Sequence, residues 1–173
     1  NDGIVLNTDN YYKTGLISKL LSKFIQGYFD KSLSFNYKLF KKDFNLIVNS
    51  GISFHDRYYD FKKKSIKNFL NERKNIKFLI VEGIFAKEIS STLCNQKYIL
   101  LELKTDKNEC MTRVVQRDIA ERGKFKEQAK NDFLKSWDIY YEKFKNKYIK
   151  TNNDEFLITK KTNLDFLIKK ILN

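Results

Sequence analysis

Residues 78–85 read Phe-Leu-Ile-Val-Glu-Gly-Ile-Phe, an apolar run that is interrupted by one acid and one glycine. Four apolar residues in a row, after a lysine-rich segment of helical pattern, predict a strand that is buried on both faces of a parallel sheet. Ligands of such sheets bind beyond the carboxyl ends of the strands, so Glu82 stands where the metal of a bound nucleotide is expected. Gly83 would allow backbone and ligand to approach closely. The alternative is that Glu82 only ends the strand at the surface.

The composition predicts one globular domain that spans residues 1–173. The chain is 42% hydrophobic and carries 34 Lys and Arg against 21 Asp and Glu, a formal net charge of +13. This charge suits a polyanionic partner such as a nucleotide. The lysines are spread along helical segments and the aromatic residues fall at helical spacing, so specific nucleic-acid binding is not expected.

The sequence also predicts where in the cell the protein is found. It contains no apolar run of the roughly 18 residues that a membrane span needs, so we expect no membrane partner. Cys94 and Cys110 lack metal-ligand spacing and do not form a disulfide framework, which is typical of reduced thiols in a cytoplasmic protein. His55, the single histidine, is assigned no role.

The order of strand and helix patterns predicts a three-layer α/β domain with a mostly parallel sheet. Further strands are expected at residues 3–6, 98–103 and 156–159, of which 98–103 should be buried. Helices are expected at 15–26, at 37–48 with a stop at Asn49-Ser50-Gly51, from 108 with Asp106 or Asn108 as cap, from 126, and after Asn163 as cap. The helix from Lys126 should carry a core stripe of Ala129, Phe133, Trp137, Tyr140, Tyr141, Phe144 and Tyr148.

Asp9 directly follows the first expected strand, so its carboxylate should lie at the same sheet edge as Glu82. The alternative is that Asp9 caps the following turn.

Three arginines gather farther along the chain, because Arg113 and Arg117 stand four residues apart on one helix face and Arg122 precedes a glycine. Guanidinium groups suit phosphate oxygens, since each offers a planar fork of donors. The alternative is a solvated helix in which the arginines pair with Asp118 and Glu121.

Five motifs resemble, in order and spacing, those of the uridine kinase family. They are residues 8–12 (Thr-Asp-Asn-Tyr-Tyr), 29–30 (Phe-Asp), 59–61 (Tyr-Asp-Phe), 81–86 (Val-Glu-Gly-Ile-Phe-Ala) and 117–123 (Arg-Asp-Ile-Ala-Glu-Arg-Gly). The resemblance covers essentially the whole chain. It implies a P-loop kinase of the uridine kinase and phosphoribulokinase group, which transfers the γ-phosphate of ATP or GTP to a nucleoside 5′-hydroxyl in pyrimidine salvage. It also implies Mg²⁺ as cofactor and a possible homo-oligomer.

The resemblance gives roles to the residues near the acceptor. Asp9 matches the general base and metal-associated acid, and Glu82 matches the acid that helps to hold Mg²⁺. Asp30 matches the carboxylate that binds the ribose hydroxyls. Tyr12 and Tyr59 match aromatic residues that contact and stack on the nucleoside.

On the phosphate side, Arg117 and Arg122 match arginines of the lid over the phosphates, and Arg113 and Lys124 are further candidates for phosphate contact. Phosphoryl transfer depends on positioning and charge neutralisation, so a lid arginine can contribute as much as the base.

The chain also departs from the family pattern around the base of the nucleoside. Lys64 stands where the family has a base-contacting histidine, and Asp132 stands where it has a glutamine. Both remain candidates for substrate contact. The phosphate-transfer half is therefore better kept than the base-reading half, which leaves open a related kinase for a sugar phosphate or pantothenate-like alcohol.

No Gly-x-x-x-x-Gly-Lys-Ser/Thr motif occurs in the 173 residues. In the family this P-loop and its strand lie just before the segment that opens this chain. The resemblance therefore predicts that the first strand and P-loop are absent from this chain, and that a piece of roughly 20 to 35 residues, one strand, loop and helix, precedes Asn1. Without that piece the chain alone is not expected to transfer phosphate. A degenerate relative that only binds a nucleotide or a partner is the alternative.

Overall fold

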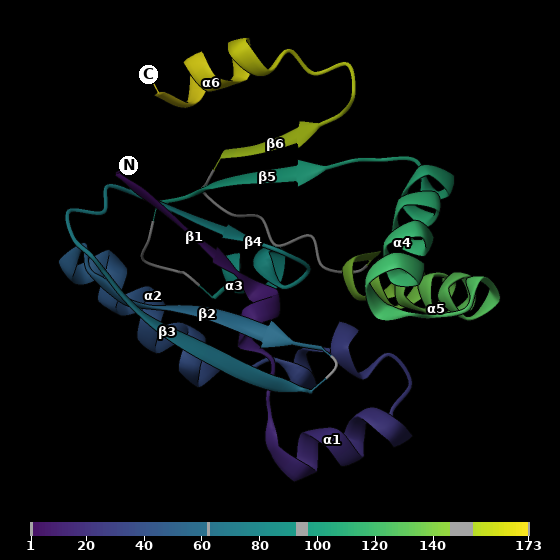
Figure 1. Cartoon of the computed structure of the whole chain (residues 1–173). Helices are drawn as coiled ribbons and strands as arrows, with labels where there is room; N and C mark the ends of the chain where they lie inside the picture. The colour runs from purple at the N-terminus through teal and green to yellow at the C-terminus, as the bar shows by residue number, and fades with distance from the viewer. Residues whose placement is uncertain (1, 62, 93–96, 146–153, 173) are drawn as a thin grey trace. The chain divides into compact units, whose positions relative to one another are not determined.

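The computed structural model describes residues 2–61, 63–92, 97–145 and 154–172, the last residue and 142–145 by backbone alone. The chain forms two compact units, Asn1–Ala86 and Lys87–Asn173, which we call the N-terminal and the C-terminal unit. Figure 1 shows the elements of both. Each unit combines a parallel strand pair with helices, so the predicted α/β class is confirmed.

The N-terminal unit is built on two parallel strands, β1 (Gly3–Asn7) and β4 (Phe78–Glu82). Their register places Asn7 opposite Glu82. The expected burial of residues 78–82 on both faces is wrong, because Phe78 and Ile80 each expose 58% of their surface. Among the described strands β4 pairs only with β1, and only one face of this pair is covered by the core.

Short helices follow β1 and lead to a longer one. They are η1 (Thr8–Tyr11), α1 (Gly15–Phe24), η2 (Tyr28–Asp30), η3 (Ser32–Ser34) and α2 (Tyr37–Ser50). The side chain of Asn36 caps α2 by accepting a hydrogen bond from the Leu39 amide at 3.2 Å. Gly51 ends it with a φ of +64°, as the Asn-Ser-Gly stop predicts.

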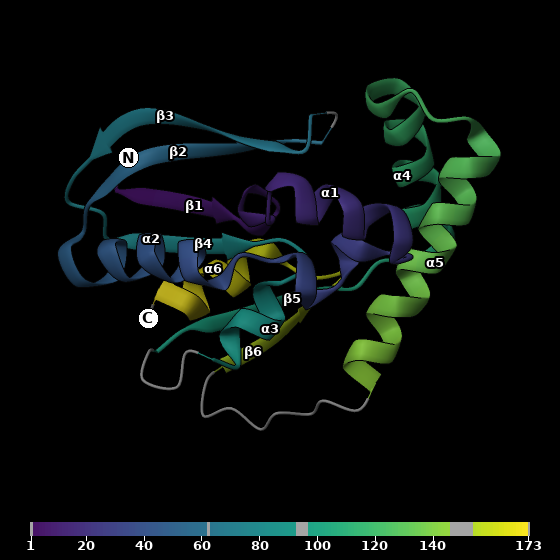
Figure 2. The ribbon, with the colours of Figure 1, turned by 90° about the horizontal axis from the view of Figure 1, so that it is seen from below.

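The lysine-rich segment before β4 does not form a helix. The strands β2 (Ser53–Asp60) and β3 (Ser65–Arg73) instead pair antiparallel, seen as a long ribbon in Figure 2. Polar pairs join the two strands: Arg57 donates to Asn68 and Arg73 donates to Asp56. The side chains of β3 are mostly exposed, so their spacing carries little information about burial, and cross-strand pairing decides the structure.

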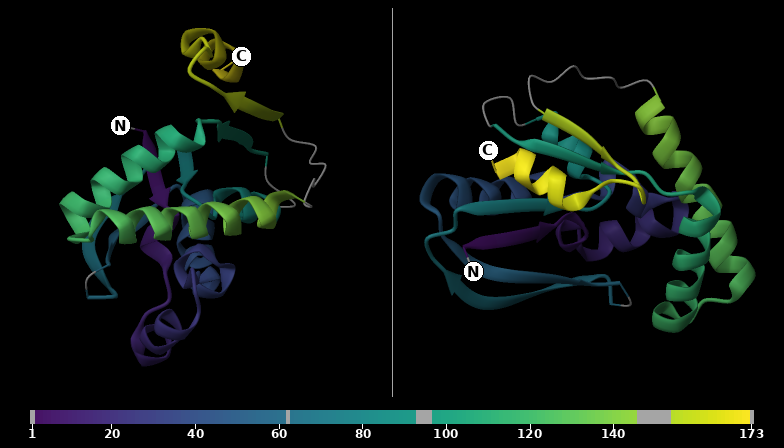
Figure 3. Two further views of the ribbon diagram at one scale, coloured as in Figure 1. Left: turned by 90° about the vertical axis from the view of Figure 1, so that its right-hand side faces the viewer. Right: turned by 90° about the horizontal axis from the view of Figure 1, so that it is seen from above.

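The C-terminal unit pairs β5 (Ile99–Leu103) with β6 (Asp154–Ile158) in parallel. Figure 3 shows this pair and the hairpin of α4 (Lys107–Arg122) and α5 (Lys126–Lys145). The remaining helices are α3 (Ala86–Ser90) and α6 (Leu164–Leu172). The expected burial of residues 98–103 is wrong, since Leu101 and Leu103 are 46% and 74% exposed.

Helix starts in this unit follow the sequence prediction. Asp106 caps α4 by accepting hydrogen bonds from the amides of Asn108 and Glu109, and Asn163 caps α6 through the amide of Phe166. On α5, Ala129 and Phe133 are buried, whereas Tyr141 is 51% exposed. The Phe144 side chain, Tyr148 and Cys94 lie outside the described residues.

None of the helices in the described part of the chain has the length and apolarity that crossing a membrane requires.

Candidate functional site

Two acids lie at the carboxyl ends of neighbouring parallel strands. Glu82 is the exposed last residue of β4 and lies opposite Asn7, the last residue of β1, while Asp9 follows two residues later in η1. The Asn7 side chain accepts a hydrogen bond from the Asp9 amide at 2.8 Å, so Asn7 rather than Asp9 caps this turn. The Asp9 carboxylate instead accepts a hydrogen bond from the Tyr12 hydroxyl at 3.2 Å.

A buried hydroxyl belongs to Thr8, the residue before Asp9. Thr8 is completely buried, and its Oγ1 has no hydrogen-bond partner among the described residues. A Cβ on Gly83, which has a φ of +114°, would lie 2.1 Å from this oxygen. Only glycine therefore fits beside Thr8, both for its backbone conformation and for the space available. A buried hydroxyl without a partner is rare and marks a position to be explained.

An aromatic cluster surrounds Tyr12, three residues after Asp9 in the chain. The ring of Tyr12, which is 3% exposed, packs edge-on at 5.1 Å against both Phe29 and Tyr59, and at 6.0 Å against Phe85. The Tyr59 amide donates to the Asn10 side chain at 3.0 Å. This bond ties β2 to the turn that carries Asp9.

Tyr59 belongs to the core of this cluster. It is 1% exposed and its hydroxyl has no partner among the described residues. Burial, together with the nearby Tyr28 and Asp60, raises the pKa of Tyr59 to about 12. The structure thus packs the Tyr59 ring against those of Tyr12 and Phe29, and its predicted stacking on a nucleoside stays a prediction.

Lys64 and Asp30 flank the same cluster. The Lys64 ammonium donates to the Ser22 hydroxyl of α1 at 2.6 Å and lies 5.8 Å from the Phe29 ring centre. Lys64 forms no ion pair with a carboxylate in the described chain. Asp30 follows Phe29 in η2 and is half-buried.

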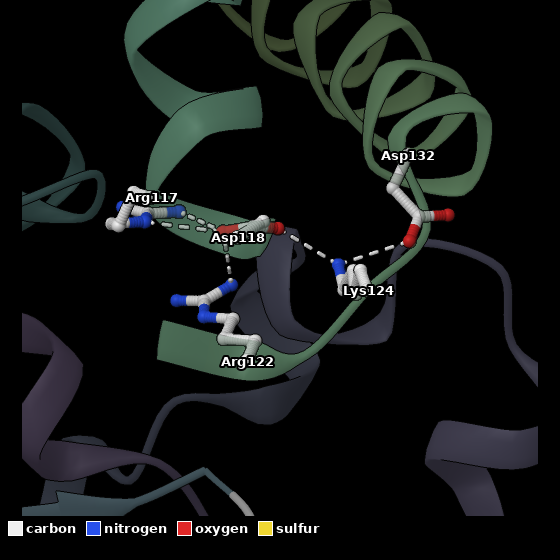
Figure 4. Close-up of polar contacts among 5 residues, drawn as sticks. All are labelled: Arg117, Asp118, Arg122, Lys124 and Asp132. Atoms are coloured by element: carbon white, nitrogen blue, oxygen red, sulfur yellow. Dashed lines mark hydrogen bonds and ion pairs between the residues drawn. The ribbon is translucent and has the colours of Figure 1, made fainter. Parts of the chain in front are cut away.

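In the C-terminal unit the predicted phosphate-binding residues surround Asp118, whose side chain is only 4% exposed. Figure 4 shows Arg117 and Arg122 beside one carboxylate oxygen, at 2.9 and 3.3 Å, and Lys124 beside the other at 2.9 Å. Lys124 also reaches Asp132 at 3.0 Å. Arg113 does not join them, because it pairs with Glu109 one turn earlier on α4.

These contacts shift the ionisation of the network. Burial alone would raise the pKa of Asp118, but hydrogen bonds from Lys124 and Arg117 and the charge of Arg122 outweigh it and lower that pKa. For Lys124, burial opposes the charged form, and the hydrogen bonds to Asp118 and Asp132 raise its pKa nonetheless. The arginine pairing considered as an alternative is thus present, around a buried rather than a solvated acid.

The predicted residues divide between the units. Asp9, Tyr12, Asp30, Tyr59, Lys64 and Glu82 lie in the N-terminal unit, and Arg113, Arg117, Arg122, Lys124 and Asp132 lie in the C-terminal unit.

The described residues contain no cluster of three or more His, Cys, Asp or Glu side chains that could hold a metal ion. Mg²⁺ nevertheless needs only one or two carboxylates beside phosphates and waters. Asp9 and Glu82 therefore remain the candidates that the family resemblance assigns to that ion.

Sequence reasoning missed the ion pair between Arg57 and Asp43. Arg57 on β2 forms two hydrogen bonds to Asp43 on α2, and the Tyr11 hydroxyl donates to the same acid at 3.1 Å. Burial and the charge of Asp43 raise the pKa of Tyr11. The contact joins residues far apart in the chain, so no local pattern signals it. Its function is to fix η1, and with it Asp9, against α2.

The fold and its relatives identify the class of protein. A crystal structure described as a "putative fructose transport system kinase" from Silicibacter sp. TM1040 superposes with a TM-score of 0.54 at 15% identity, covering 79% of this chain and 69% of that one. At this identity the likeness shows a P-loop kinase-like fold. The model of the phosphoribulokinase/uridine kinase family matches residues 6–156. The chain therefore belongs to this family. No curated protein matches it.

Proposed function

We propose that this protein is an ATP- or GTP-dependent kinase that transfers the γ-phosphate to a nucleoside 5′-hydroxyl in the cytoplasm. Membership in the phosphoribulokinase/uridine kinase family supports phosphoryl transfer to a small molecule. The observation that carries the proposal is the pair of acids, Asp9 and Glu82, at the ends of adjacent parallel strands beside the buried hydroxyl of Thr8. Ligands of open α/β sheets bind at this edge.

Each residue has a task in this reaction. Asp9 accepts the proton of the attacking hydroxyl, and the hydrogen bond from Tyr12 orients its carboxylate. Asp9 and Glu82 would hold Mg²⁺, which neutralises charge on the phosphates. Asp30 binds the acceptor's hydroxyls. Arg117 and Arg122, with Arg113 and Lys124, are the candidates that the family resemblance assigns to the phosphates, whose negative charge guanidinium groups suit.

A binding measurement with the 173-residue chain tests the acceptor half separately, because these residues contain no P-loop motif. Calorimetric titration should show uridine or cytidine binding that Asp30→Asn weakens about tenfold. A panel of sugar phosphates and pantothenate-like acids serves as comparison. If the chain bound neither the nucleosides nor any compound of the comparison panel, the proposal would be refuted.

Turnover with MgATP or MgGTP, measured on the protein from its natural source, tests the catalytic half. Asp9→Asn should lower kcat by about 10²- to 10⁴-fold, the range of a positioned general base. Asp2→Asn is the matched control, because Asp2 is 55% exposed and pairs only with Lys77 in the described chain. Equal loss in both variants, or none in Asp9→Asn, would remove Asp9 from the mechanism.

Two observations favour other candidate functions. The protein would then be a kinase for another small alcohol, or a relative that binds without catalysis. Lys64 is an ammonium without a carboxylate partner in the described chain, and Asp132 is engaged by Lys124. Lys64→His should raise pyrimidine affinity if the acceptor is a nucleoside, and should weaken binding if it is an anionic alcohol. Acceptor binding without any turnover would support the non-catalytic relative.

A further inference from the structure

Helix α1 turns its apolar side outward. Leu16, Ile17, Leu20 and Phe24 expose 85%, 76%, 56% and 79% of their surface, and we call these four residues the outer face of α1. Ser18, on the opposite side, is only 4% exposed. Amphipathic helices of globular domains normally bury the apolar stripe and expose the polar one. This helix does the reverse, and Figure 1 shows it at the periphery of its unit.

Polar contacts hold α1 in this orientation. The Ser18 hydroxyl donates to the Lys13 carbonyl at 2.7 Å and accepts from the Tyr28 hydroxyl at 3.2 Å. One turn later the Ser22 hydroxyl accepts from Lys64 at 2.6 Å. Rotating the helix to bury its leucines would break all three bonds and would leave the buried Tyr28 hydroxyl unpaired. The outward apolar face is therefore built into the fold of the unit.

The charged residues of α1 and of its immediate flanks are all lysines. Residues 10–29 contain Lys13, Lys19 and Lys23 and no Asp or Glu. All three lysines are exposed, and none of them forms an ion pair within the described chain. With a net charge of +13, a second copy of the chain would be repelled from this face, whereas an anionic surface would be attracted. Leu70 on β3 is equally exposed, at 83%, but acids lie in its own hairpin, among them Asp56 and Glu72.

We propose that the outer face of α1 docks onto a membrane surface that contains anionic phospholipid. A basic amphipathic helix binds such surfaces by placing its apolar side chains at the boundary between headgroups and acyl chains, while its lysines remain among the phosphates. The lack of an apolar run of membrane-spanning length predicts no membrane partner. Docking of this kind is peripheral and needs no such run, so this proposal departs from that prediction. It uses residues that are distinct from the acids and arginines of the proposed kinase site, so the two proposals can fail separately.

Co-sedimentation with lipid vesicles tests the docking. The full 173-residue chain should bind vesicles of phosphatidylcholine with phosphatidylserine and should not bind phosphatidylcholine alone, and added salt should weaken the binding. Phe24→Ser should lower the partition coefficient at least tenfold, because it removes an exposed anchor without touching the core. Lys19→Gln and Lys23→Gln should each lower it about fivefold. Leu70→Ser is the matched control and should bind as the wild type does.

Three results would overturn the docking. The first is absence of binding to anionic vesicles, and the second is equal binding of the wild type and Phe24→Ser. The third is a dimer, detected by light scattering, that Phe24→Ser dissociates, since this would assign the outer face to a second copy. Unchanged circular dichroism of Phe24→Ser would show that its fold is intact, so each outcome reports on the face itself.

Discussion

Thr8 and Asp118 are buried polar side chains beside predicted site residues, one in each unit, and they differ in what satisfies them. The Thr8 hydroxyl, fully buried next to Asp9, has no hydrogen-bond partner among the described residues. The Asp118 carboxylate, 4% exposed, lies within 3.3 Å of Arg117, Arg122 and Lys124. One buried group is left without a partner, and the other is surrounded by opposite charges.

The difference indicates what each region is built for. A buried carboxylate that is paired on both oxygens is satisfied by the protein itself, so its network holds α4 and the start of α5 in one arrangement. A buried hydroxyl without a partner costs stability that a ligand could restore. Asp118 thus holds the arginines beside it in place, whereas the Thr8 hydroxyl has no hydrogen-bond partner among the described residues.

The largest effect is expected from Asp118→Ala. It would leave three cations around an empty position and should lower the free energy of unfolding by about 3 kcal/mol. This is the low end of the range for a broken buried pair, because Arg117, Arg122 and Lys124 keep 44%, 30% and 24% exposure. Urea denaturation measures the change.

Asp138→Asn is the control for this variant. Asp138 is 69% exposed, and its nearest ion-pair contact, to Lys107, is long at 3.9 Å. Its loss should therefore change the free energy of unfolding by less than about 0.5 kcal/mol. Equal effects of the two variants would mean that the Asp118 network does not stabilise the C-terminal unit.

Gly83→Ala tests the space beside Thr8. The new Cβ would meet Thr8 Oγ1 at 2.1 Å in a backbone with a φ of +114°. We expect a loss of about 2 kcal/mol or more, from strain and from the displaced threonine. Gly15→Ala isolates the strain, because Gly15 has a φ of +92° and nothing within 4 Å of the added Cβ. A Gly83 variant no worse than the Gly15 variant would show that the close approach is absent.

The pH dependence of stability should distinguish Asp118 from an ordinary surface acid. Its pKa is lowered by its cations, so its contribution is complete above about pH 4, the range of unperturbed Asp. The contribution is lost as the pH falls through the lowered pKa. The difference in unfolding free energy between wild type and Asp118→Asn should therefore be constant near neutral pH and narrow below about pH 4. A difference that does not change with pH would contradict the pairing.

Local features of this fold could be predicted from the sequence. The caps at Asp106 and Asn163 and the stop at Gly51 involve side chains and backbone within a few residues, so residue type and spacing suffice. The parallel pairing of residues 78–82 followed from an apolar run that ends in an acid and a glycine. The family was likewise predicted from short motifs, and the model of the phosphoribulokinase/uridine kinase family matches residues 6–156.

Long-range features could not be predicted in this way. The β2–β3 hairpin depends on cross-strand partners such as Asp56 and Arg73. The orientation of α1 depends on Tyr28 and Lys64, which lie outside the helix, so its apolar stripe alone predicts the wrong side as buried. The burial of Asp118 could not be predicted from the sequence either, because an acid next to an arginine usually forms an ion pair at the surface.

Thr8→Val gives the smallest effect and the opposite sign. It removes the unpartnered hydroxyl while keeping the shape of the side chain, so stability should rise by up to about 1 kcal/mol, whereas Thr8→Ser should lose a similar amount with its methyl group. If the hydroxyl serves a bound group, Thr8→Val should also lower phosphoryl transfer about tenfold, and Thr8→Ser should keep it. A valine variant that is less stable than the wild type would show that a partner, such as a buried water, already satisfies Thr8. The contrast with Asp118 would then disappear, since both side chains would be structural.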